Sequence, residues 1–292
     1  MTSLIPEWFI SAFAVATVFV VMFRLGLGIL PLELLHVWRH PVLMLKALFS
    51  VLVAVPVIAL VVTRLLDLPR AAEVGIVVMA IAPGAPIALQ RSLDAGARRS
   101  FAPGLQVTVA LAAVISMPLS IAALDVLYDA TATASPWQIM RQVTVVQLLP
   151  LALGILTGRR LPRLAVRFEP LVDRAWKLLL VVLLVMAVIG FGRVMVAAGL
   201  SVAFAAAVTT LAALAVGHWL GGPDPGTRTA VAITSAARNP GLALLVAALN
   251  DAAPAIKATM LTYMVVAAVV ALPYALARGW RRRPPQDEET LT

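Results

Sequence analysis

Long apolar runs follow one another along almost the whole chain, and short polar segments separate them. Nine of these runs are close to the ~20 residues that a helix needs to cross the hydrocarbon core of a bilayer. They span residues 8–30, 42–62, 71–89, 101–124, 139–156, 176–195, 200–220, 227–249 and 255–277. The pattern therefore predicts an all-α integral membrane protein with about nine transmembrane helices.

Two of the nine runs contain residues that do not suit an uninterrupted helix. The third run contains Pro83 and Gly84, and the eighth contains Pro240 and Gly241. Proline lacks a backbone N–H and clashes with the preceding turn, and glycine permits unusual dihedral angles. Two Pro/Gly-broken spans, one in each half of a chain, predict a transporter in which the two breaks cross near the bilayer midplane.

The spacing of the prolines favours two inverted repeats. Pro83 precedes Pro118 by 35 residues, and Pro240 precedes Pro273 by 33. The third and eighth runs are an odd number of crossings apart, so they enter the membrane from opposite sides. The alternative is that proline is simply commoner in membrane helices than in soluble ones. The predicted organisation is a first repeat of spans one to four plus span five (1–157), a basic cytoplasmic linker (158–175), the remainder of the second repeat (176–280) and a disordered cytoplasmic tail (281–292).

The composition agrees with a membrane protein and explains the positive charge. The chain is 62% hydrophobic and 13% charged, whereas a soluble domain has about 25% charged residues. A net charge of +9 could indicate a nucleic-acid partner, but arginine-rich cytoplasmic loops account for it and no nucleic acid is expected. The first run is too long for a signal-peptide core and is interpreted as a span.

The positive-inside rule sets the expected orientation. With the N-terminus outside, one side of the membrane receives 15 Lys and Arg residues and the other receives five. The rule therefore predicts a cytoplasmic C-terminus, and we expect the bacterial inner membrane. The 15 residues are Arg39, Arg91, Arg98, Arg99, Arg159, Arg160, Arg163, Arg167, Arg174, Lys177, Arg228, Arg278, Arg281, Arg282 and Arg283.

Several kinds of chemistry have no support in the sequence. There is no cysteine, which excludes disulfides and thiol chemistry. No HExxH, GxSxG or Walker A motif occurs, so we expect neither an enzyme nor a cofactor. Glu33, His36 and His40 have a spacing that could hold a metal, but an interfacial role beside Trp38 is favoured and no metal site is predicted.

Arg238 places a permanent charge near the middle of the eighth run, where insertion costs roughly 2.5–3.5 kcal/mol. The acidic candidates Asp94, Asp125 and Asp129 lie at span ends or in loops, so Arg238 has no obvious carboxylate partner. One interpretation is a fixed cation at the crossing, or a group that meets an anionic substrate. The other is that Arg238 caps freed carbonyls or reaches Asp94.

Other polar residues near the breaks are candidates for lining a substrate cavity, because backbone groups freed in hydrocarbon must face protein, water or a ligand. Thr234 and Ser235 could instead bond back to the preceding helical turn, and groups such as Gln106 and Thr108 also hold helices together. The candidates are Arg238, Asn239, Thr234, Ser235, Gln90, Gln106 and Thr108, with the backbone at Pro83, Gly84, Pro240 and Gly241.

Four stretches carry a resemblance to a known family. They are HPVLMLKALFSVLVAVP (40–56), TRLLDLP (63–69), APG (82–84) and ARNPGLAL (237–244). The chain resembles the bile acid:sodium symporter family over nearly its whole length. The resemblance implies two inverted repeats, a panel domain, a core domain and a substrate cavity where the broken helices cross. Members with nine spans lack the first helix, which fits the nine runs here.

The chain departs from the family at the positions that the resemblance assigns to sodium binding. A polar pair with an Asn is replaced by Ala88 and Leu89, a Glu by Thr234 and a Gln by Arg238. A gap-free match places Val51 where the family has a second Gln. These departures put both sodium sites in question, and we expect Arg238 to supply the charge of a sodium ion.

The sequence thus predicts a secondary transporter that moves a small organic anion by alternating access without the usual sodium sites. One alternative is a sodium-coupled symporter with unusual ion ligands. The other is a membrane ligand sensor or scaffold that does not transport. The expected partners are the solute and the lipid bilayer, and nothing in the sequence indicates an oligomeric state.

Overall fold

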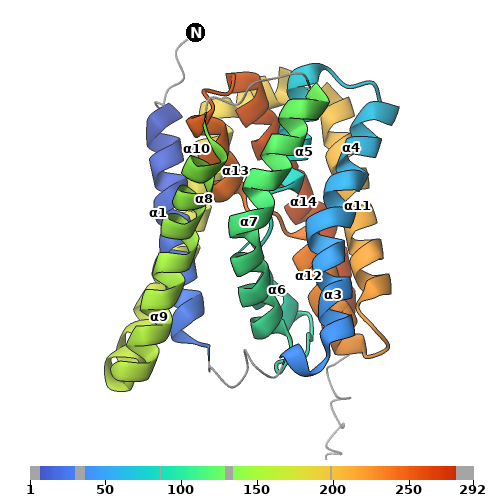
Figure 1. The fold of residues 1–292 in the computed structure, drawn as a ribbon. Helices are drawn as coiled ribbons and strands as arrows, with labels where there is room; N and C mark the ends of the chain where they lie inside the picture. The colour runs from blue at the N-terminus through green and yellow to red at the C-terminus, as the bar shows by residue number, and fades with distance from the viewer. Residues whose placement is uncertain (1–6, 30–36, 86, 129–133, 198, 281–292) are drawn as a thin grey trace, which may run out of the picture.

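The computed structural model describes residues 7–29, 37–85, 87–128, 134–197 and 199–280, which form helices and connecting turns and contain no β-strand. The helices run side by side between two ends of the molecule (Figure 1). In the first half they are α1 (Glu7–Leu27), the short η1 (Val37–Arg39), α3 (Pro41–Phe49), the π-helical η2 (Ser50–Ala54), α4 (Val55–Leu65), α5 (Arg70–Ala80), α6 (Ile87–Asp94) and α7 (Ala102–Tyr128).

The second half continues with helices that are longer on average. They are α8 (Pro136–Val143), the π-helical η3 (Thr144–Leu148), α9 (Leu149–Arg160), α10 (Pro162–Ala197), α11 (Gly199–Leu220), α12 (Pro225–Ala236), α13 (Pro240–Leu249) and α14 (Pro254–Trp280). No break separates α3, η2 and α4, and none separates α8, η3 and α9, so each set forms one helix of 25 residues.

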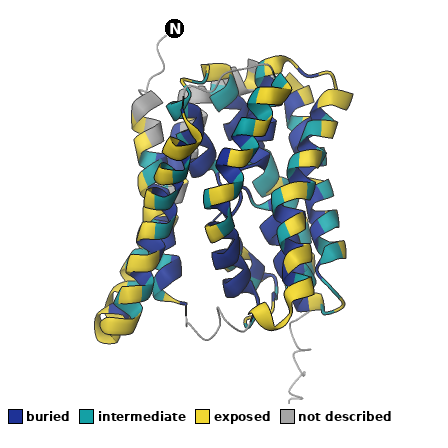
Figure 2. Ribbon diagram, in the orientation of Figure 1, coloured by how far each residue is buried: buried dark blue, intermediate teal, exposed yellow. Residues whose placement is uncertain are grey.

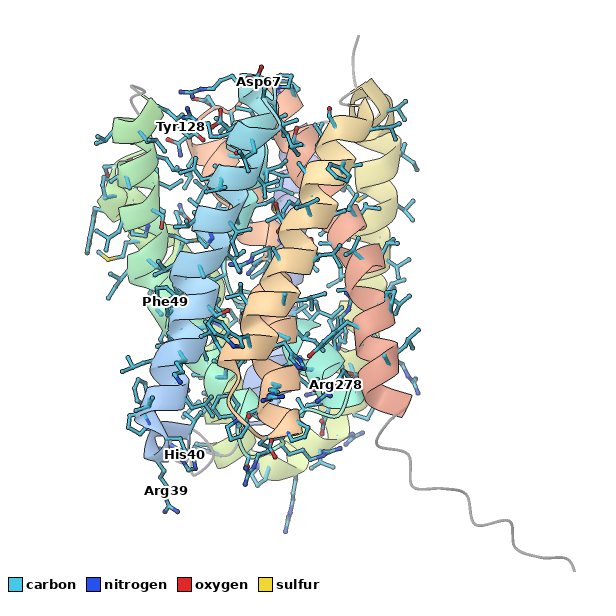
Figure 3. The ribbon with its side chains drawn as sticks, turned by 90° about the vertical axis from the view of Figure 1, so that its right-hand side faces the viewer. Arg39, His40, Phe49, Asp67, Tyr128 and Arg278 are labelled. Carbon is cyan, nitrogen blue, oxygen red and sulfur yellow. The ribbon has the colours of Figure 1, made fainter. Side chains whose placement is uncertain are left out.

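The outer surface between the two ends is apolar. Phe49, Leu119 and Ile115 are each more than half exposed on the outside of their helices. In Figure 3, Arg39, His40 and Arg278 lie toward one end, Asp67 and Tyr128 lie at the other, and Phe49 lies between them. Figure 2 shows that the buried residues face the interior of the bundle. An apolar belt between polar ends is the surface of an integral membrane protein.

Six helical segments are long and apolar enough to cross a membrane, and they end in α4, α7, α9, α11, α13 and α14. Each of the nine predicted runs falls on a helix or a pair of helices. The apolar part of α1 (Ala12–Leu27) and the 11 and 8 residues of α5 and α6 are shorter than a full span. The number of nine spans and the inverted repeats therefore remain predictions.

Other predicted segments can be compared with the structure. The stretch predicted as a basic linker is helical, because α9 continues to Arg160 and α10 begins at Pro162. The tail 281–292, together with Glu33, His36 and Asp129, lies outside the described residues. Among the residues that are described, no group of three or more His, Asp or Glu side chains could hold a metal ion.

The helices pack as two groups. In the first, which we name the panel, α1 lies against α9 and α10. In the second, the core group, α11 packs on α4, α12 and α14, and α14 also packs on α5. The panel contacts the core group through α1 against α13, through α10 against α14 and through α8, which continues into α9, against α7. The broken pair α12–α13 lies inside the bundle, and most of its residues are buried.

Candidate functional site

The two helix breaks touch each other. The first separates α5 from α6, and the second separates α12 from α13. The Asn239 backbone N–H donates a hydrogen bond to the Ala82 carbonyl oxygen at 2.9 Å. Gly84 has a φ of 77°, which is a conformation that favours glycine, so the chain can turn sharply at this point. The crossing joins residues that are far apart in the sequence.

Arg238 reaches from the second break to three backbone carbonyls. Its Nη1 donates to Val51 O at 2.9 Å and to Ala80 O at 2.8 Å. Its Nη2 donates to Ser235 O. The side chain is 5% exposed, so these bonds form away from water. The guanidinium therefore ties together η2, the end of α5 and the end of α12.

Each of the three carbonyls lacks a helical partner for a reason that the sequence explains. In η2 the Val55 N–H bonds to Ser50 O, five residues back. The next bond of this kind would join residue 56 to Val51 O, but Pro56 has no N–H. Ser235 O loses its helical partner because the Asn239 N–H bonds to Ala82 O instead. Ala80 is the last residue of α5, where carbonyls have no intrahelical partner.

The electrostatics of this arrangement favour a cation. Carbonyl oxygens at the C-terminal ends of helices carry partial negative charge, and two of the three acceptors lie at such ends. No ion pair joins Arg238 to a carboxylate in the described part of the chain. Asp94, the predicted alternative partner, accepts a bond from Gln90 at 2.8 Å. Arg238 thus caps freed carbonyls, which was one of its two predicted roles.

Other polar side chains complete the crossing. Ser235 Oγ lies 2.8 Å from Ser50 Oγ, so these two hydroxyls join two helices. Asn239 Oδ1 accepts from the Leu242 N–H and caps α13. Gln106 Nε2 donates to Ala85 O in the first break at 3.0 Å. The crossing is therefore held by side chains from several helices.

A cavity of about 570 Å³ lies beside the crossing, between the panel and the core group. Most of its lining is apolar and comes from α1, α10 and α14. Arg238 and Asn239 line it. Their Nε and Nδ2 atoms are buried at this edge of the cavity without a hydrogen-bond partner among the described residues. Two N–H donors without a partner therefore lie beside a mostly apolar space.

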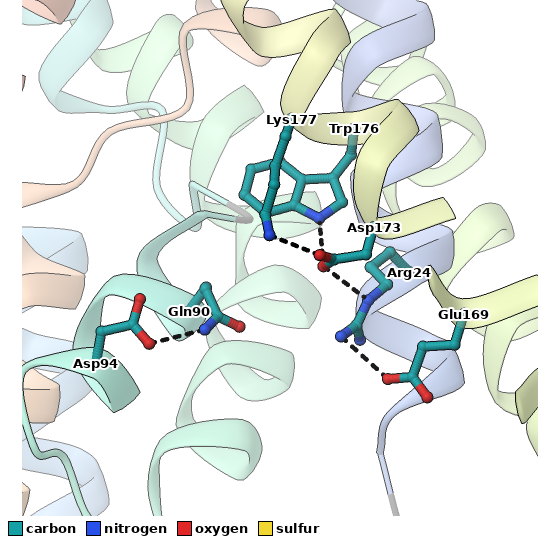
Figure 4. A network of polar contacts seen from close by, with 7 residues as sticks. All are labelled: Arg24, Gln90, Asp94, Glu169, Asp173, Trp176 and Lys177. Atoms are coloured by element: carbon teal, nitrogen blue, oxygen red, sulfur yellow. Dashed lines mark hydrogen bonds and ion pairs between the residues drawn. The ribbon is translucent and has the colours of Figure 1, made fainter. Parts of the chain in front are cut away.

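The cavity extends from the crossing toward the ends of α6 and α14, where Asp94 and Gly279 line it. Figure 4 shows the polar groups near this end. On the panel side, Arg24 of α1 pairs with Glu169 and Asp173 of α10 at 3.1 and 3.4 Å.

On the core side of the same end, Gln90 bonds to Asp94. Hydrogen bonds from Lys177 and Trp176 lower the pKa of Asp173, which keeps its carboxylate charged. The mouth of the cavity is thus polar, whereas its interior is apolar.

A comparison with protein families gives a match over residues 15–199 to the model described as the sodium bile acid symporter family. The match covers more than half of the 292 residues. The chain belongs to the sodium bile acid symporter family. No curated protein matches the chain.

Members of this family are membrane transporters, which confirms the prediction that the protein is not an enzyme and that it acts in transport. The matched residues include most of the panel and the first break, whereas Arg238 and the second break lie beyond them. The assignment of the second break thus rests on the hydrogen bonds at the crossing and on the motif ARNPGLAL.

The structure of this family member does not bring all the predicted site residues to the cavity. Arg238, Asn239, Pro240 and Gly241 line it. Pro83, Gly84, Thr234, Ser235 and Gln106 are buried at or near the crossing but are not part of the lining.

Two predicted residues point elsewhere. Gln90 is exposed on α6 and bonds to Asp94, outside the cavity lining. The Thr108 hydroxyl bonds back to Gly104 O in its own helix at 2.8 Å.

Several residues of the site were missed by sequence reasoning. Ser50, Pro56 and Tyr263 lie in the middle of apolar runs, where a hydroxyl or a proline is a detectable signal. Tyr263 lines the cavity, and its buried hydroxyl has no partner among the described residues. Glu73 is a buried carboxylate within the third run and is 7% exposed. It accepts hydrogen bonds from Arg64 and Tyr128 and is not a partner of Arg238.

Proposed function

We propose that this transporter moves an amphipathic organic anion by alternating access, and that it does so without sodium. The observation that carries the proposal is the guanidinium of Arg238 on the carbonyls of Val51, Ala80 and Ser235. Three converging carbonyl oxygens, two of them at helix ends, suit a cation, and in this chain a covalently attached cation occupies that position. A sodium ion would meet both the bulk and the charge of the guanidinium there.

The cavity lining supports the choice of substrate. An apolar space of about 570 Å³ suits a rigid hydrocarbon body, because burying apolar surface is favourable. Arg238 and Asn239 lie at its inner end, and a rotation of their side chains would turn the buried, unpaired Nε and Nδ2 toward a ligand. An anionic head group there would gain charge-assisted hydrogen bonds, which are about twice as strong as neutral ones. The name of the family points to bile acids as a first class to test.

The position of the cavity supports an inward-open state of the transporter. The cavity reaches the ends of α6 and α14, and the positive-inside rule places that end in the cytoplasm. With the N-terminus outside, the arrangement corresponds to an inward-open transporter. Rocking of the panel against the core group would open the opposite end.

The first experiment measures thermal unfolding of the purified protein with taurocholate, in sodium chloride and in potassium chloride. A ligand that binds only the folded state raises stability by roughly 2.7 kcal/mol at a hundredfold excess over its Kd. We expect equal stabilisation in both salts, and none for Arg238→Ala. Arg98→Ala, which removes an exposed arginine, serves as the control and should behave like wild type.

Stabilisation by sodium alone would overturn the sodium-free mechanism and favour a symporter with unusual ligands. Flux separates transport from sensing. Proteoliposomes loaded with potassium salts should accumulate labelled taurocholate down its own gradient at the same rate with and without external sodium. Binding without flux would identify a ligand sensor.

A further inference from the structure

One surface of the molecule lies outside the lining of the cavity. It is the first third of α10, from Pro162 to Arg174, together with the end of α9. α10 has 36 residues, which corresponds to about 54 Å, whereas the hydrocarbon core of a bilayer is about 30 Å thick. The helix is therefore longer than the apolar layer and extends into the head-group region.

The two sides of this segment differ. Ala165 and Trp176 are buried against the protein, and Glu169 and Asp173 turn to Arg24 of α1. The acidic groups of the segment are thus engaged on its inner side. The outward side is left with the arginines.

Three arginines form a stripe on the outward side. Arg163, Arg167 and Arg174 are four and seven residues apart, a spacing that places side chains on one helical face. All three are exposed, and none forms an ion pair within the described ranges. Arg159 and Arg160, exposed at the end of α9, add to the same corner, which projects from the body of the molecule in Figure 1.

Apolar side chains run beside the arginines. Leu164 and Leu171 are 43% and 61% exposed, and Phe168 is 49% exposed. The row continues through Leu178 and Val185, at 64% and 48% exposed, onto the apolar outer surface of α10. An exposed apolar row that runs without interruption into a membrane-facing surface fits acyl chains, and the arginines beside its end fit the phosphates of the same molecules.

We propose that Arg163, Arg167 and Arg174, with Leu164 and Leu171, form a binding surface for anionic phospholipids. The continuity of this surface with the outer face of α10 distinguishes lipid from a soluble anion or a protein partner. Because α10 belongs to the panel and lines the cavity at Trp176 and Leu183, bound lipid would hold the panel at the membrane surface. The proposal does not depend on the identity of the transported solute.

The test compares phosphatidylglycerol with phosphatidylcholine as additives in thermal unfolding of the detergent-solubilised protein. Wild type should be stabilised more by phosphatidylglycerol. In the triple variant Arg163→Gln/Arg167→Gln/Arg174→Gln, the preference should fall by roughly a factor of five in affinity for each arginine removed. The control Arg39→Gln/Arg98→Gln/Arg99→Gln loses the same charge from exposed positions and should keep the preference.

A preference that survives in the triple variant, or that is lost equally in the control, overturns the proposal. Equal stabilisation by glycerol phosphate, which has no acyl chains, also overturns it, because the surface would then be a soluble-anion site. If the triple variant does not fold, the single variants Arg163→Gln and Arg167→Gln replace it. If both single variants keep the full preference for phosphatidylglycerol, the proposal is overturned as well.

Discussion

At the residue scale, one side chain holds three backbone carbonyls of the crossing. Arg238 satisfies three carbonyls that no backbone N–H reaches. A buried carbonyl without a partner costs about 1–3 kcal/mol, so the guanidinium offsets several such costs at once. The same charge makes a mobile cation at this position unfavourable. In the proposed mechanism, the structure of the crossing and independence from sodium therefore depend on the same group.

The change Arg238→Gln tests this dual role. The shorter amide leaves oxygens of Val51, Ala80 and Ser235 around a space that a hard cation with oxygen ligands can enter. We expect a lower Tm in choline chloride than wild type shows, and a partial recovery in sodium chloride. Thermal unfolding in the two salts measures this. Equal Tm values for the variant in both salts would show that the carbonyls do not form a cation site.

At the element scale, a proline in one helix sets the need for an arginine in another. η2 precedes Pro56, and the carbonyl that Pro56 leaves free belongs to Val51. η3 has the same arrangement, because Pro150 follows the first residue of η3 by six positions, as Pro56 follows the first residue of η2. Pro150 therefore leaves the carbonyl of Val145 free. Only the first of these two freed carbonyls lies within reach of Arg238.

Pro56→Ala should therefore act differently in two backgrounds. The new N–H at position 56 can donate to Val51 O. In wild type this oxygen already accepts a bond from Arg238, whereas in Arg238→Ala it has lost that donor. We expect Pro56→Ala to be more stabilising in the Arg238→Ala background, with a coupling of about 1 kcal/mol. A double-mutant cycle of unfolding free energies measures the coupling. Pro150→Ala should give the same effect in both backgrounds, and a coupling equal to that of Pro56→Ala would refute the link.

The same scale shows what the sequence can and cannot predict. Pro83, Gly84, Pro240 and Gly241 located both breaks, because a missing N–H and a permissive backbone are local properties. The partners of Arg238 were not predictable by residue, since Val51 and Ala80 are 187 and 158 positions away. The direction of Gln90 was missed because it depends on where α6 begins after the break.

At the scale of the whole molecule, the cavity has a direction. It runs along α14 from Tyr263 to Gly279, which is about 24 Å at 1.5 Å per residue. Arg238 and Asn239 are at one end, and the polar residue Asp94 is at the other. A solute that enters by the mouth would thus bind head first at the crossing, with its apolar body along α1 and α14.

Cysteine accessibility tests this direction, and the absence of cysteine from the chain makes each introduced thiol unique. Ala268 lines the cavity midway along α14, whereas Leu119 is 64% exposed on the outer surface of α7. A thiol reacts as the thiolate, which requires access to water. A membrane-impermeant maleimide should therefore label Ala268→Cys from the side of the C-terminus, and an anion that binds at Arg238 should slow the labelling.

The control Leu119→Cys faces lipid and should stay unlabelled from either side. Labelling of Ala268→Cys only from the opposite side would show that the predicted orientation is wrong. The cavity reaches the ends of α6 and α14, so the side that gives labelling is the side on which these two helix ends lie. Labelling that comes equally from both sides in the absence of solute would mean that the panel already rocks freely. The bound anion would then be expected to select one of the two states, since a ligand shifts such an equilibrium only by its difference in affinity for them.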